Sequence, residues 1–136
     1  MSRFLPADHS KGDERTIGGY AAVHARPAAF EGRDGFSYSV EILADRSDDA
    51  AATFGAFFLF VQWKRFGEQA VEGHLESPFL AHGANADAAM IALGAMPVEE
   101  VQRHLDALIA EREAAARESA AREQRRTAAL DDEDAP

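Results

Sequence analysis

The polar side chains best spaced for chemistry lie on one short segment, residues 70–77. Glu72, His74 and Glu76 alternate there with smaller or apolar residues, and His82 follows after a short gap. In an extended strand alternate side chains lie on the same face, so two carboxylates and an imidazole would be neighbours. Such groups bind metal ions or transfer protons. Together with His82 they form the candidate ligand-binding site.

The same residues have a simpler interpretation as a solvated strand face that carries one histidine. Their spacing matches no established zinc pattern. The chain has no cysteine, which removes thiolate nucleophiles and cysteine-ligated metals. Ser37, Ser39 and Ser77 lack the context of a nucleophile elbow. We therefore expect no metal, no cofactor and no covalent catalysis, and a non-enzymatic role is favoured.

A run without charges, AAATFGAFFLFV at residues 50–61, is the clearest structural signal in the chain. It predicts a buried central strand over residues 54–66. The side chains at odd positions make one continuous apolar face, which we expect to pack against helices: Phe57, Leu59, Val61 and Trp63. This register directs Phe58 and Phe60 to the opposite face of the sheet.

Phe58 and Phe60 are the candidate interface residues, because their predicted face is otherwise polar. Burying a phenylalanine contributes about 1.5 to 3 kcal/mol, and apolar clusters with polar rims often mark association surfaces. The pair predicts a homodimer or another protein partner. In the alternative interpretation, the N-terminal segment or the helical extension of the same chain covers both rings.

The remaining patterns predict a meander of strands followed by helices. A weak strand at residues 20–30 belongs at the sheet margin because Pro27 cannot donate a ladder hydrogen bond. Two glycines at residues 31–35 suit a hairpin, and a period of two marks strands at 36–42 and 70–77. Asn85 or Asp87 caps a helix at 86–93. The fold class is α+β, a four-stranded antiparallel meander sheet with two C-terminal helices packed on one face.

The second of these helices begins near Pro97 and extends into solvent. Its apolar stripe stops at Ile109 and is followed by charged residues spaced for i,i+4 pairs. The expected organisation is a flexible N-terminal segment at 1–19, an α+β domain at 20–112, and a charged helical extension with an acidic disordered tail at 113–136.

The negative charge of the chain makes some classes of binding partner unfavourable. With 24 acidic and 14 basic residues, its net charge is −10, which repels nucleic acid and anionic membranes. We expect no nucleic-acid or membrane partner and a soluble, cytoplasmic protein. Its expected function is that of a small interaction or regulatory protein that self-associates through the second sheet face. The alternative is a small-molecule or metal-binding domain, an enzyme included, that uses Glu72, His74 and Glu76.

Overall fold

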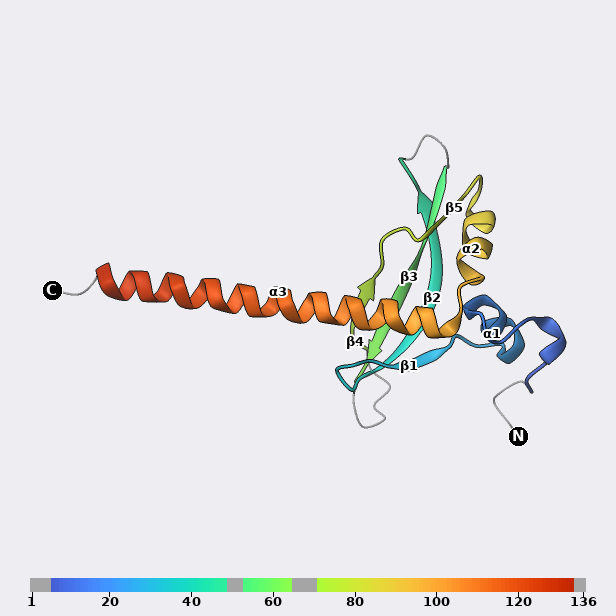
Figure 1. Ribbon diagram of the computed structural model, residues 1–136, viewed down its shortest axis with the longest axis horizontal. Helices are drawn as coiled ribbons and strands as arrows, with labels where there is room; N and C mark the ends of the chain where they lie inside the picture. Colours follow the sequence, from blue (N-terminus) through green and yellow to red (C-terminus); the bar gives the residue numbers. More distant parts are fainter. Residues whose placement is uncertain (1–5, 49–52, 65–70, 134–136) are drawn as a thin grey trace.

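A computed structural model describes residues 6–48, 53–64 and 71–133. Its antiparallel sheet has the strand order β1-β2-β3-β4, and β5 pairs with β3 in line with β4. The strands are β1 (Ala29–Glu31), β2 (Ser37–Arg46), β3 (Phe54–Trp63), β4 (Val71–Glu76) and β5 (Ala81–Gly83). The helices are η1 (His9–Lys11), α1 (Ile17–His24), α2 (Ala86–Gly94) and α3 (Val98–Glu133). This arrangement confirms the predicted α+β class, with an antiparallel meander and helices after it, whereas the fifth strand, β5, was not predicted (Figure 1).

The helices pack on the sheet face that carries the even-numbered side chains of β3. Phe60 pairs with Val40 of β2 and Leu75 of β4, and Phe58 and Phe60 are both 0% exposed. The predicted facing of β3 was therefore wrong. Both faces of this strand are apolar, so its own sequence does not choose between them. The neighbouring strands β2 and β4 determine which face packs against the helices. On the other face they place Glu41 and Glu76 beside Leu59, and burying these two carboxylates would be costly.

The core forms where the predicted stripe of α3 meets this sheet face. Val101, Leu105 and Ile109 recur every four residues and are completely buried, together with Leu93 of α2. This period places them on one side of a helix, as the sequence indicated. Asn85 caps α2 by accepting a hydrogen bond from the backbone N–H of Ala88 at 2.8 Å.

The N-terminal part of the domain differs from the prediction of a strand at residues 20–30. A helix, α1, forms instead, and the Thr16 side chain caps it by accepting a hydrogen bond from the N–H of Gly19 at 3.0 Å. Ile17 is buried, although it belongs to the segment predicted to be flexible. Gly18 allows α1 to cross α2 closely, because a Cβ there would lie 3.0 Å from the Cα of Gly94.

Helix α3 continues far beyond the sheet (Figure 1). From Ala114 to Leu130 its side chains are exposed apart from half-buried Ala121, as expected for a helix without an apolar stripe. The helix reaches Glu133, so it includes the start of the predicted acidic tail, while residues 134–136 lie outside the described part. No helix among the described residues is long and apolar enough to cross a membrane.

Candidate functional site: the open face of the sheet

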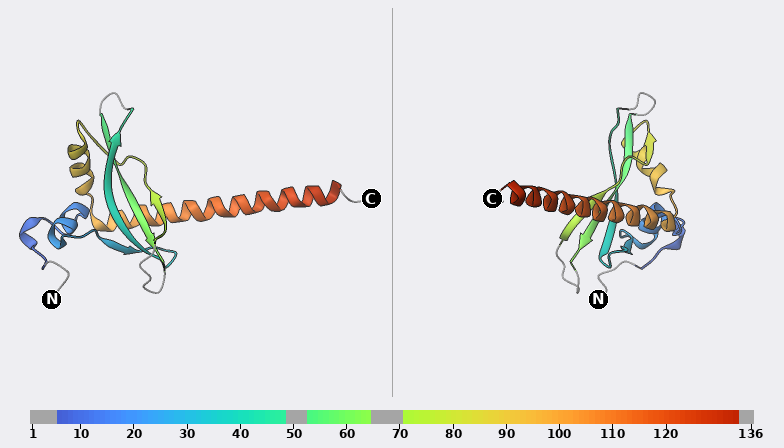
Figure 2. Two further views of the ribbon diagram at one scale, coloured as in Figure 1. Left: turned by 180° about the vertical axis from the view of Figure 1, so that it is seen from behind. Right: turned by 60° about the vertical axis from the view of Figure 1, so that its left-hand side comes forward.

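One face of the sheet is turned away from the helices, and we call it the open face. In the view from behind, the strands lie in front of α3 (Figure 2). The register places the odd-numbered side chains of β3 there, half-buried, beside the more exposed Leu43 of β2 and Val71 of β4. The apolar members of the open face are Leu43, Phe57, Leu59, Val61, Trp63, Val71 and Phe79.

An aromatic cluster forms one end of the open face. The ring of Phe79, which follows β4, lies 6.0 Å from that of Phe57 and 6.0 Å from that of His82. Gly55 makes room for it, since a Cβ at this position would come within 2.4 Å of the Phe79 ring. Phe79 nevertheless stays 38% exposed, so the cluster remains accessible to a partner.

Trp63 forms the other end. Its indole N–H donates a hydrogen bond to the hydroxyl of Ser39 at 3.0 Å, which satisfies its one polar group within the sheet. The rest of the ring therefore contributes apolar surface. The register shifts between Gln62 and Trp63, and Glu72 has no cross-strand partner at this irregularity.

The predicted ligand-binding residues lie along the margin of this face. His74 pairs with Val61 and Glu76 with Leu59, on strand β4, and both polar side chains are exposed. Glu72 lies at the irregularity, and His82 belongs to β5 with the aromatic cluster. Within the described ranges, no group of three or more His, Cys, Asp or Glu side chains is placed to hold a metal ion. These residues thus border an apolar surface.

The two predicted interface residues are absent from the open face. Phe58 and Phe60 are fully buried with their rings 5.7 Å apart, and the Phe58 ring lies 6.5 Å from that of His104 on α3. The assignment of Phe58 and Phe60 to an exposed surface is corrected, because the helices cover them. Self-association, if it uses a sheet face, must use the neighbouring odd-numbered residues.

A polar network that the sequence did not reveal fixes α3 to the end of the sheet. Arg112 donates hydrogen bonds to Gln62 Oε1 at 2.9 Å and to the Tyr38 hydroxyl at 2.9 Å, and it pairs with Asp34 at 3.2 Å. The Tyr38 hydroxyl in turn donates to Asp34 at 2.6 Å. Asp34 and Arg112 are 78 residues apart in the chain, so no local pattern links them.

Burial raises the pKa of Tyr38 to about 12, and the hydrogen bond to Asp34 adds to the effect while Arg112 opposes it. A phenol with this pKa keeps its proton and serves as a hydrogen-bond donor. Every buried side-chain nitrogen or oxygen in the described part of the chain has a hydrogen-bond partner. The network therefore has the character of a structural clamp.

Among the grooves that the described residues form away from the open face, two border α1. One, of about 560 Å³, runs between α1 and α2 and is lined by Gly18, Met90 and Ile91 among others. The second, of about 440 Å³, separates the end of α1 from β2. His74 and Glu76 line neither groove.

Comparison of the chain with protein-family models, curated proteins and solved structures found no match. A functional proposal for this chain must therefore be argued from the geometry of its own surface.

Proposed function

We propose that this protein is a non-enzymatic interaction module that self-associates through the open face of its sheet. The observation that supports the proposal is the continuous apolar surface from the Phe57–Phe79 cluster to Trp63, on a sheet whose other face already holds the core. Apolar patches of this kind mark interaction sites in otherwise well-covered domains. The alternative of metal binding at Glu72, His74 and Glu76 receives no comparable support within the described residues.

A second copy of the chain is a suitable occupant because a sheet face complements itself. Two sheets stack face to face about 10 Å apart, and a twofold axis brings the same patch of both copies together. The open face has an apolar centre and a margin that includes Glu41, His74 and Glu76. An apolar core inside a polar rim is the usual composition of a protein–protein interface.

The size of the open face sets the expected strength of association. The ten residues of β3 span about 33 Å and three neighbouring strands about 14 Å, which gives a footprint on the order of 450 Å² per copy. Stable complexes bury about 800 Å² per partner. We therefore expect a reversible dimer whose population rises with protein concentration.

The test is the solution mass of the 14.7-kDa chain by sedimentation equilibrium between about 1 and 200 µM. The mass should rise from that of a monomer toward twice that value. The variant Leu59→Lys should remain monomeric and folded, since the new ammonium group lies between Glu41 and Glu76 in the sheet.

A matched control is Ile91→Lys, which changes another exposed apolar residue, on α2 and away from the open face. It should dimerise as the parent does. A parent that stays monomeric over the whole range contradicts self-association. A Leu59→Lys variant that still dimerises, with an unchanged circular dichroism spectrum, places the interface elsewhere.

A further inference from the structure

The outer edge of β2 is only partly paired. Strand β1 covers three residues of β2, from Ser37 to Ser39, and the last hydrogen bond on this side joins the N–H of Val40 to Ala28 O at 3.2 Å. Backbone groups of alternate residues point to the same edge of a strand. Those of Ile42 and Ala44 therefore point away from β3, to the side of β1 but beyond the first residue of β1, Ala29.

Ile42 and Ala44 leave two N–H and two C=O groups without a partner among the described residues. The next outward amide, that of Arg46, is already covered, because it donates to the carboxylate of Asp45 at 2.8 Å. The unpaired part of this edge, which we call the free stretch, therefore comprises Ile42 to Ala44, with β1 at one end and the Asp45 carboxylate at the other.

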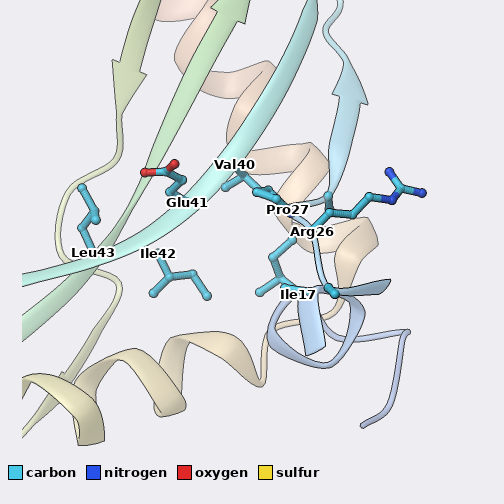
Figure 3. A pocket seen from close by; sticks show the side chains of 10 residues that line it. Ile17, Arg26, Pro27, Val40, Glu41, Ile42 and Leu43 are labelled. Atoms are coloured by element: carbon cyan, nitrogen blue, oxygen red, sulfur yellow. The ribbon is translucent and has the colours of Figure 1, made fainter. Parts of the chain in front are cut away.

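A groove of about 440 Å³ runs beside this free stretch (Figure 3). Ile17 and Ile42 point toward one another across it, and the guanidinium of Arg26 points away. Ala25 adopts a left-handed backbone with φ of 52° at the end of α1, and Pro27 follows. The chain therefore turns and joins the sheet only at Ala29, which leaves the space open.

We propose that this edge binds an extended peptide segment as an additional antiparallel strand, in line with β1. Peptide residues opposite Ile42 and Ala44 would direct their side chains to the α1 side, where Ile17 and Ala21 form an apolar wall. Adding a strand to a sheet edge in this way supplies affinity through backbone hydrogen bonds and specificity through alternate side chains.

The other peptide side chains would lie on the open-face side of the edge. There they meet a row formed by Glu41, Leu43 and Asp45, whose two carboxylates are exposed. Basic residues complement this row, and the net charge of −10 attracts them from a distance. The occupant is accordingly a segment in which apolar and basic residues alternate.

The dimensions favour a short segment over a second copy of the chain. Ten residues line the groove, whereas a stable protein–protein interface uses about 20 to 30 residues from each partner. Charges on an edge strand also have another use, since they discourage unwanted pairing. If a basic peptide binds, the carboxylates of Glu41 and Asp45 recognise a partner; if it does not bind, they only protect the edge from unwanted pairing.

The probe is a fluorescein-labelled peptide of alternating valine and lysine, Val-Lys-Val-Lys-Val-Lys-Val, and its matched control replaces each lysine by glutamate. We expect saturable binding of the lysine peptide to the full chain in a fluorescence anisotropy titration, and none of the control. In the complex, amide hydrogen exchange at Ile42 and Ala44 should slow by about tenfold or more, because both amides gain acceptors.

Two variants and two controls identify the site. Ala44→Pro removes one outward N–H, which an edge strand tolerates, and should weaken binding by about tenfold or more. Ala44→Val keeps that N–H and should bind as the parent does. Ala21→Phe fills the groove from α1 and should also weaken binding, whereas Ile91→Lys, on α2 and outside this groove, should not.

The proposal is overturned if the folded parent does not bind the lysine peptide, which assigns Glu41 and Asp45 to edge protection alone. It is also overturned if binding leaves exchange at Ile42 and Ala44 unchanged. If Ala44→Pro does not fold, the test rests on peptide binding by Ala21→Phe. A folded Ala21→Phe variant that binds the lysine peptide as the parent does shows that the groove is not the binding site.

Discussion

Replacing Arg112 by methionine tests whether the Arg112–Tyr38–Asp34 network clamps α3 to the sheet. Methionine keeps an unbranched apolar stem of similar length but removes all donors. We expect the free energy of unfolding to fall by about 2 to 4 kcal/mol, and two losses make up this value.

The first loss concerns Gln62, which is 5% exposed and whose side-chain oxygen accepts from Arg112. Leaving a buried acceptor unsatisfied costs about 1 to 3 kcal/mol. The second is the ion pair with Asp34. Because the Arg112 side chain is 40% exposed, this pair contributes about 1 kcal/mol and not the 3 to 5 kcal/mol of a fully buried pair.

Urea unfolding followed by circular dichroism measures this difference, at one protein concentration so that association does not contribute. The control is Arg117→Met, which removes an exposed arginine of the same helix beyond the sheet and should change stability by less than about 0.5 kcal/mol. An Arg112→Met variant as stable as this control refutes the clamp.

Because the pKa of Tyr38 is raised, the contribution of the same network to the free energy of unfolding depends on pH. The pKa is about 12 in the folded protein and near 10 in the unfolded chain, so between these values the folded state holds more protons. Stability is therefore complete below about pH 10 and falls by up to roughly 2 to 3 kcal/mol as the pH rises to 12. Tyr38→Phe should remove this part of the decline. An identical alkaline decline in Tyr38→Phe contradicts the assignment.

Three further predictions concern the fold. Phe60→Ala should cost about 3 to 5 kcal/mol and half-buried Val61→Ala clearly less, in urea unfolding; equal losses contradict the observed facing of β3. Gly18→Ala should cost about 1 to 3 kcal/mol by forcing α1 away from Gly94, and unchanged stability means that the crossing adapts. Deleting residues 117–136 should shift the melting temperature by less than about 2 °C, whereas a larger drop in calorimetry shows that the extension docks.

Several elements were predictable because their signals are local. The uncharged run marked β3, and the four-residue recurrence of Val101, Leu105 and Ile109 marked the docking stripe of α3. Asn85 was a recognisable helix cap, and Gly35 adopts the positive φ, 83°, that the predicted hairpin required. Each of these features depends on residues only a few positions apart.

The N-terminal segment and the candidate sites depended on contacts between distant segments. Residues 17–24 contain two glycines and no strong helical pattern, and α1 forms because Ile17 and Val23 bury their side chains. The open edge of β2 exists because β1 begins only at Ala29, which no spacing within β2 indicates. The Asp34–Arg112 pair likewise required the sheet and α3 to meet.

The alternation along β3 established from the sequence which side chains share a face. It did not establish which face the helices cover, because Phe58 and Phe60 on one side and Leu59 and Val61 on the other are equally apolar. Only the strand register resolved this. It aligns Leu59 with Glu41 and Glu76, and the free energy of removing these two carboxylates from water disfavours packing the helices on that face.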